Sequence, residues 1–147
     1  MEQRIDLQQV SPEGFRAVFG LERHVRSAVK PELLWIVKLR ASVVNGCAHC
    51  VDMHGVHAIE AGEDVRRVLA VSAWRESTFF SPAERAALAL TDAVTRLGED
   101  GVTDAVWQAA VDELGQDLVV ELLIAIATIN VWNRLAVSAH TASPALA

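Results

Sequence analysis

Residues 41–54 read ASVVNGCAHCVDMH, and this stretch decides how the chain folds around its only two cysteines. Asn45 and Gly46 interrupt an apolar helical pattern, because glycine readily adopts the backbone conformation that ends a helix. A new helix is expected to begin around Cys47. The stretch therefore predicts a helix, a break and a second helix that carries a Cys-x-x-Cys pair in its first turn.

The two cysteines and the histidines near them form a candidate redox site. Unpaired N–H groups and the positive dipole end at a helix start favour the thiolate form. His54 lies one helical turn after Cys50, within hydrogen-bonding reach, and can take or return its proton; His49 is a second candidate proton carrier. Such a thiolate can attack a hydroperoxide, become a sulfenic acid and be captured by the second thiol as a disulfide. Protonated His54 would then supply a proton to the departing alkoxide or hydroxide.

Two other interpretations of the cysteine pair stay open at this point. The thiols could bind zinc together with His49, His54 or His57, although three ligands on one short helix and no distant Cys-x-x-Cys disfavour a closed zinc site. The pair could also be a chance spacing of buried, inert thiols. We expect neither a metal nor a cofactor.

Composition excludes several other classes of protein. The chain has 147 residues, 52% of them hydrophobic, so we expect one domain spanning residues 1–147. The net charge is −6, which makes nucleic acid an improbable partner. The charged N-terminus lacks the apolar core of a signal peptide, so we expect a cytoplasmic protein, where a lone cysteine pair is more often catalytic, redox-sensing or metal-binding than structural.

The chain is predicted to be all-helical, since proline and glycine separate segments of helical periodicity. Ser81 and Glu84 have the spacing of a capping box. The expected helices cover about residues 12–28, 31–44, 47–62, 63–72, 82–97, 103–114 and 116–138. The apolar run Leu118–Trp132 is too short to span a bilayer and contains Glu121 and Asn130, so no membrane insertion is expected.

The last of these helices is apolar on nearly every side and must be enclosed. We therefore expect a homo-oligomer in which a second subunit covers part of the apolar surface. Asn130, Asn133 and Arg134 interrupt this surface and need polar partners, so we interpret them as structural. The side chains expected to supply the excess apolar surface are Trp107, Leu122, Leu123, Ile126, Ile129 and Trp132.

The segment Ser42–His54 resembles the core motif of the AhpD-like alkylhydroperoxidase group in the carboxymuconolactone decarboxylase superfamily. Residues 74–88 and 129–135 also resemble compact members, so the similarity covers about Pro31 to Ser138. The resemblance implies an AhpD-like bundle of about six to seven helices, assembled into trimers or hexamers. It also implies reduction of hydroperoxides, with an external dithiol or protein reductant. By this resemblance Cys50 attacks the peroxide, Cys47 resolves the intermediate, and His54 and His49 belong to the proton relay.

One position departs from the family pattern. The relay glutamate of the family stands twelve residues before the first cysteine, where this chain has Trp35. Glu32, three residues earlier on the same helical face, is a candidate replacement, or else a first-turn acid that stabilises its own helix dipole. The departure keeps a second hypothesis open, a thiol redox sensor or scaffold without turnover. A lactone decarboxylase is disfavoured, because that activity is not expected to depend on the Cys-x-x-Cys pair.

Overall fold

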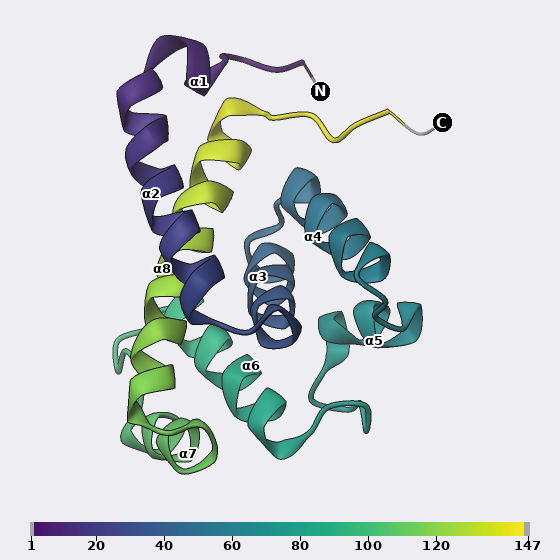
Figure 1. Cartoon of the computed structure of the whole chain (residues 1–147), viewed down its shortest axis with the longest axis vertical. Coiled ribbons are helices and arrows are strands. Elements are labelled where there is room, and N and C mark those ends of the chain that lie inside the picture. Colours follow the sequence, from purple (N-terminus) through teal and green to yellow (C-terminus); the bar gives the residue numbers. More distant parts are fainter. Residues whose placement is uncertain (1, 146–147) are drawn as a thin grey trace.

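The computed structural model describes residues 2–145, and within that range the chain is helical with no strand (Figure 1). The predicted all-helical fold is confirmed, and seven of the helices match the expected ones. The eighth, α1, is a single turn that was not expected. The helices are α1 (Leu7–Val10), α2 (Pro12–Ala28), α3 (Pro31–Asn45), α4 (Ala48–Glu60), α5 (Val65–Ala70), α6 (Pro82–Thr95), α7 (Asp104–Leu114) and α8 (Gln116–Ala139), with a 3-10 turn η1 at Val71–Ala73.

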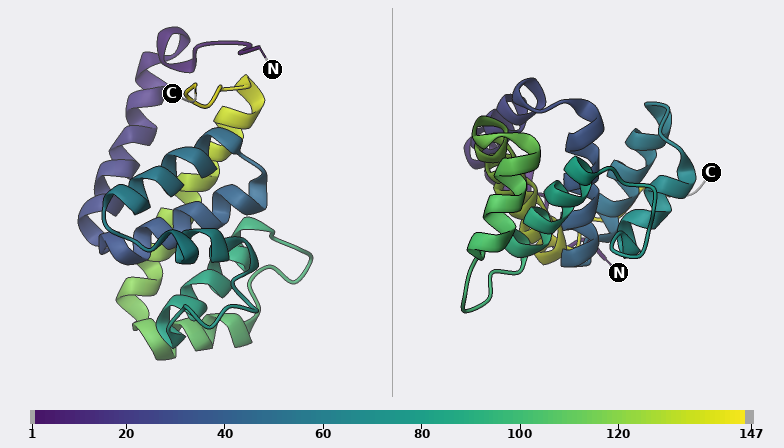
Figure 2. Two further views of the ribbon diagram at one scale, coloured as in Figure 1. Left: turned by 90° about the vertical axis from the view of Figure 1, so that its right-hand side faces the viewer. Right: turned by 90° about the horizontal axis from the view of Figure 1, so that it is seen from below.

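Helix α3 lies at the centre of the bundle. Its neighbours are α4, α6 and α8, and it is buried almost continuously from Leu34 to Ser42, with Trp35 half-buried. Figure 2 shows α2 and α8 on one side of α3 and α4 and α5 on the other. The main core lies between α2, α3, α6, α7 and α8, and a smaller one, which includes Ile36, Trp74 and Leu88, lies between α3, η1 and α6.

Helix α8 is long and apolar enough to cross a membrane by length and composition alone, with a mean hydropathy of 1.6 over its most apolar window. In the structure it packs against α2, α3, α6 and α7, as the core helix of a globular bundle does. Leu122, Ile126 and Ile129 are fully buried by the chain's own helices, so these three side chains supply no surface for a second subunit. Trp107 remains 36% exposed.

The helix boundaries follow local sequence signals. Ser81 and Glu84 form the predicted capping box at the start of α6, and the Thr103 side chain caps α7. The largest differences are two residues at a helix end: α4 ends at Glu60 rather than 62, α6 ends at Thr95 rather than 97, and α5 spans only Val65–Ala70 rather than 63–72. The Asp64 side chain caps α5 and so sets its late start.

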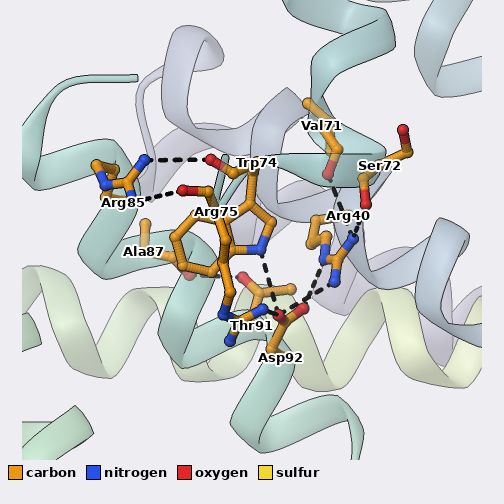
Figure 3. A network of polar contacts seen from close by, with 9 residues as sticks. All are labelled: Arg40, Val71, Ser72, Trp74, Arg75, Arg85, Ala87, Thr91 and Asp92. Atoms are coloured by element: carbon orange, nitrogen blue, oxygen red, sulfur yellow. Dashed lines mark hydrogen bonds and ion pairs between the residues drawn. The ribbon is translucent and has the colours of Figure 1, made fainter. Parts of the chain in front are cut away.

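A buried ion pair holds α3 to α6 and to the segment between η1 and α6 (Figure 3). The Arg40 Nε atom lies 2.5 Å from Asp92 Oδ1, and the Arg40 guanidinium also donates to the carbonyl oxygens of Val71 and Ser72. The indole of Trp74 and the guanidinium of Arg75 donate to Asp92 Oδ2. Both oxygens of this buried carboxylate have donors, so the network ties α3 to α6 and to the segment that follows α5.

Candidate functional site

The cysteine pair is placed by the break between α3 and α4. Gly46 ends α3 with φ 65° and ψ 29°, a left-handed conformation that favours glycine. Cys47 is the N-cap of α4, and its sulfur accepts a hydrogen bond from the Cys50 N–H at 3.3 Å. Cys47 and Cys50 are joined by a disulfide, with their Cα atoms 5.3 Å apart. The predicted helix, break and helix is confirmed.

Both cysteines are buried, and Cys50 lines a cavity of about 270 Å³ that we call the thiol pocket. The pocket lies between α1, α2, α4 and α8, so residues far apart in the sequence meet there. It brings Cys50 together with His49 and His54, three of the four predicted site residues. Its lining consists of Leu7, Phe15, Phe19, Glu22, Arg26, His49, Cys50, Met53, His54, Trp132, Leu135, Ala136 and Thr141.

His54 is almost fully buried, and its Nε2 atom has no hydrogen-bond partner among the described residues. Burial lowers the pKa of His54 to about 3, the positive charge of Lys38 adds to this shift, and Glu22 opposes it. The imidazole is therefore neutral in this disulfide state. It can accept the proton of the Cys50 thiol after reduction, and it becomes a proton donor only after that transfer.

His49 is half-buried and lines the thiol pocket. Its Nδ1 atom lies 2.9 Å from the carbonyl oxygen of Ala142, in the segment after α8. A neutral ring that donates from Nδ1 to this carbonyl leaves Nε2 as an acceptor. His49 is thus tied to the C-terminal segment rather than to either cysteine.

Glu22 and Lys38 form a buried ion pair beside His54 that sequence analysis missed. The carboxylate of Glu22, on α2, accepts hydrogen bonds from Lys38 on α3 and from Nε of Arg26. Burial alone would raise the pKa of Glu22, but the bonds from Lys38 and Arg26 outweigh it and lower the pKa. Burial lowers the pKa of Lys38, and Glu22 opposes that shift. One signal was present: Lys38 stands in the apolar run LLWIVKL, and a buried lysine requires a partner.

Aromatic side chains form one wall of the thiol pocket. The ring of Trp132 meets the rings of Phe15 and Phe19 edge to face, with centroid distances of 5.0 Å and 5.9 Å. This geometry is a favoured one for aromatic pairs. Met53 and Leu135 extend the apolar lining. The pocket therefore joins an apolar wall to one sulfur atom and a few polar groups.

A second, larger cavity of about 580 Å³ lies on the other side of His54, and we call it the outer cavity. Trp35 and the exposed Glu32 line this cavity and do not line the thiol pocket. Glu32 lies in the first turn of α3, where an acid stabilises the helix dipole. Arg26 and His54 line both cavities, whereas Lys38 lines only the outer one.

Asn130 and Asn133 tie the end of α3, just before the cysteines, to α8. The Asn45 side-chain amide donates to the side-chain oxygens of both, each at 2.9 Å. The Asn133 amide donates to the Ser42 hydroxyl at 3.0 Å, and Arg134 donates to Asn130. These polar groups have partners within the chain, as their structural interpretation required.

No group of three or more His, Cys, Asp or Glu side chains in the described part of the chain lies close enough to hold an ion. Residues 2–145 contain no free cysteine in this state, because both sulfurs are in the disulfide.

Comparison with known proteins gives consistent matches. The model of the carboxymuconolactone decarboxylase family matches residues 12–93. The chain is 32% identical over 139 residues to the uncharacterized protein YdfG of Bacillus subtilis (strain 168), which covers 94% of this chain and 95% of YdfG.

Solved structures share the fold. ATU0492 from Agrobacterium tumefaciens, a protein of unknown function suggested to be the antioxidant defence protein AhpD, is 37% identical with a TM-score of 0.96, covering 99% of this chain and 100% of that one. A peroxidase-related AhpD-core protein from Ralstonia eutropha JMP134 has a TM-score of 0.74 at 22% identity, over 93% of this chain and 74% of that one. The debrominase Bmp8 has a TM-score of 0.82 at 22% identity, over 94% and 75%. At these two identities the likeness extends to the fold alone.

Proposed function

Because this chain belongs to the carboxymuconolactone decarboxylase family, with an AhpD-like fold and a Cys-x-x-Cys disulfide, we propose that it reduces hydroperoxides through Cys47 and Cys50. The observation that carries the proposal is that Cys50 and a neutral His54, whose Nε2 atom has no partner among the described residues, line one largely apolar pocket. A thiol that shares a largely apolar pocket with a neutral base is suited to nucleophilic attack on a peroxide.

The first half-reaction begins from the dithiol state. His54 takes the proton of the Cys50 thiol, and the thiolate attacks the terminal oxygen of the hydroperoxide. The S–O bond forms as the O–O bond breaks, which leaves a sulfenic acid on Cys50 and an alkoxide. The His54 imidazolium returns its proton to the alkoxide, which leaves as an alcohol. His49, which also lines the pocket, is the proposed second proton carrier.

The second half-reaction restores the state seen in the structure. The Cys47 thiol attacks the Cys50 sulfur, the S–S bond forms, and the hydroxyl group leaves as water with the Cys47 proton. In the resulting disulfide the Cα atoms of Cys47 and Cys50 lie 5.3 Å apart, within the usual range for a disulfide. An external dithiol or a protein reductant then supplies two electrons and two protons, and is itself oxidised to a disulfide.

The lining of the thiol pocket supports an organic hydroperoxide as substrate. Phe15, Phe19 and Trp132 offer an apolar wall that hydrogen peroxide cannot use. Burial of an alkyl or aryl group against this wall would gain about 25 cal/mol per Å² of apolar surface removed from water.

A homo-oligomer remains part of the proposal. Helix α8 carries the exposed apolar side chains Val120, Val131 and Val137, and Phe19 is exposed on α2 beside it. Such side chains are candidates for a subunit contact. Light scattering coupled to size exclusion would give the number of copies.

The test of the function is rapid mixing of the reduced protein with cumene hydroperoxide, with thiols counted before and after. The wild type should lose both of its thiols per chain, and the Cys50→Ser variant should consume no peroxide. A Cys50→Ser variant that consumed peroxide at the wild-type rate would overturn the assignment of Cys50.

A steady-state assay separates the peroxidase from a redox sensor. Turnover with a dithiol reductant such as dithiothreitol or dihydrolipoamide supports the enzyme. Stoichiometric disulfide formation without turnover under every dithiol tried would instead support a thiol redox sensor of the same fold.

A further inference from the structure

Two polar atoms of the thiol pocket lack partners among the described residues. His54 Nε2 is buried and neither accepts a hydrogen bond from these residues nor donates one to them. Glu22 accepts hydrogen bonds from Lys38 and Arg26 on its Oε1 atom, and its Oε2 atom accepts no hydrogen bond from the described residues. Glu22 and His54 line the same pocket with Cys50. His54 Nε2 can carry a proton, whereas Glu22 Oε2 can only accept a hydrogen bond while the carboxylate is ionised.

The environment of Glu22 keeps its carboxylate ionised although it is only 5% exposed. Lys38 is 3% exposed and pairs with it, and Arg26 donates to the same oxygen from a largely solvent-exposed side chain. A carboxylate with two cationic donors on one oxygen retains acceptor capacity on the other. The pair thus presents a negative oxygen at a pocket whose lining is largely apolar.

We propose that Glu22 is the carboxylate of the thiol site, a positioning residue whose Oε2 atom accepts the Nε2–H hydrogen bond of the His54 imidazolium, directly or through one water molecule. The imidazolium exists only after His54 has taken the Cys50 proton, so the bond stabilises the thiolate state and not the resting disulfide. This inference rests on the proposed function of Cys50 and His54. It assigns to α2 a role that Trp35 cannot perform on α3.

Other charged groups near His54 do not offer the same acceptor. Arg26 and Lys38 are cationic and can only donate hydrogen bonds. His57 follows His54 on α4 and lines the outer cavity. Glu32 and Glu63 also line the outer cavity and are absent from the thiol pocket. From α8 the pocket receives Trp132, Leu135 and Ala136, none of which is charged. Glu22 is the one carboxylate that lines the pocket in the described part of the chain.

The test measures how readily Cys50 forms its thiolate, independently of peroxide. In a Cys47→Ser background, the rate of Cys50 alkylation by iodoacetamide is followed against pH in the reduced protein. Glu22→Gln should lower the rate at neutral pH by about tenfold and move the midpoint toward the free-thiol value of about 8.5. Glu22→Asp should recover part of the rate, because it keeps an ionised acceptor.

A double variant separates the proposed role of Glu22 from the effect of leaving Lys38 buried without its partner. Glu22→Gln alone leaves a buried, unpaired lysine, whereas Glu22→Gln with Lys38→Met removes both charges of the pair and leaves no unpaired charge on Lys38. The double variant should stay as slow as Glu22→Gln, because the acceptor for His54 is still missing. Wild-type alkylation rate and midpoint in the double variant would overturn the proposal and leave the pair as a structural element.

The matched control removes the other buried ion pair of α3. Arg40→Met with Asp92→Asn deletes a pair of similar burial outside the thiol pocket, and it should leave the alkylation profile of Cys50 unchanged. An equal slowing in this control would assign the effect to general loosening of α3 and would also overturn the proposal. Peroxide consumption by the wild type is a separate measurement, so failure of the peroxidase function and failure of the Glu22 assignment give different results.

Discussion

Glu22 on α2 and Lys38 on α3 form a buried ion pair that stands between two cavities, with Glu22 facing the thiol pocket and Lys38 the outer cavity. The residues are 16 positions apart and belong to different helices. The pair therefore links α2 to α3 and also places a charged side chain in the pocket of Cys50. It also explains how a buried lysine is tolerated at the centre of α3.

Replacement of Trp35 by glutamate should not accelerate the reaction. Trp35 lines the outer cavity, so the new carboxylate would lie beside Lys38 and not in the thiol pocket. We expect a single-turnover rate with cumene hydroperoxide that is unchanged or lower. A rate several-fold above the wild type would mean that the site lacks a carboxylate and that Glu22 does not supply it.

Removal of the resolving thiol should stop the reaction after its first step. In Cys47→Ser, Cys50 is expected to consume one equivalent of hydroperoxide per chain and to remain a sulfenic acid, because no second thiol can form the disulfide. Mass spectrometry after trapping with dimedone would detect it. Formation of an intramolecular disulfide is impossible in this variant, so sustained turnover with dithiol would show that the reductant resolves Cys50 directly.

Truncation of the aromatic wall should change substrate preference. Trp132→Ala removes the ring that contacts Phe15 and Phe19, so kcat/KM for cumene hydroperoxide should fall by roughly tenfold, since an aromatic contact plus its buried area is worth about 1–3 kcal/mol. The value for hydrogen peroxide should change little. Equal losses for both substrates would point to distortion of the site. Trp107→Ala, on the exposed surface of α7, is the control of matched chemistry.

The Asp92 network should carry a large part of the stability. Asp92→Asn removes the charged partner of the buried Arg40, a change that typically costs about 3–5 kcal/mol. Burial alone would raise the pKa of Asp92, but Arg40 and Arg75 lower it, so the contribution is present near neutral pH and is lost in acid. Urea unfolding of the wild type and of Asp92→Asn near neutral pH and in acid measures this contribution to the free energy of unfolding. Asp112→Asn, on the exposed face of α7, should cost less than about 0.5 kcal/mol.

Acid should destabilise the disulfide form through His54. Its pKa is about 3 in the folded chain and about 6.5 when unfolded, so the unfolded state binds the extra proton between these values. The free energy of unfolding should therefore fall by about 1 kcal/mol for each pH unit as the pH drops from about 6 to 5. Urea unfolding of the wild type and of His54→Gln at the two pH values tests this. The difference between their slopes isolates His54, and equal slopes would mean that the imidazole is charged in the fold.

Local signals in the sequence were enough for most of the helices. Gly46 ends α3, Ser81 and Glu84 cap α6, and Gly115 separates α7 from α8, because each depends on backbone conformations or hydrogen bonds within a few residues. The single turn α1 was missed because four residues carry too short a pattern. The start of α5 was placed two residues early because Asp64 caps this helix, so that it begins at Val65 rather than 63.

The sequence by itself determined the helical class, the position of the Cys-x-x-Cys pair at a helix start and the turn of helix that separates Cys50 from His54. These features arise from spacing along one or two helices, which the chain carries locally. Only the tertiary structure decided that His54 is buried and neutral, and that Trp132 from α8 walls the pocket. It also decided that Glu22 from α2, and not Glu32, lines the thiol pocket. Desolvation and pairing between helices depend on what packs against a side chain, and no spacing within one helix contains that information.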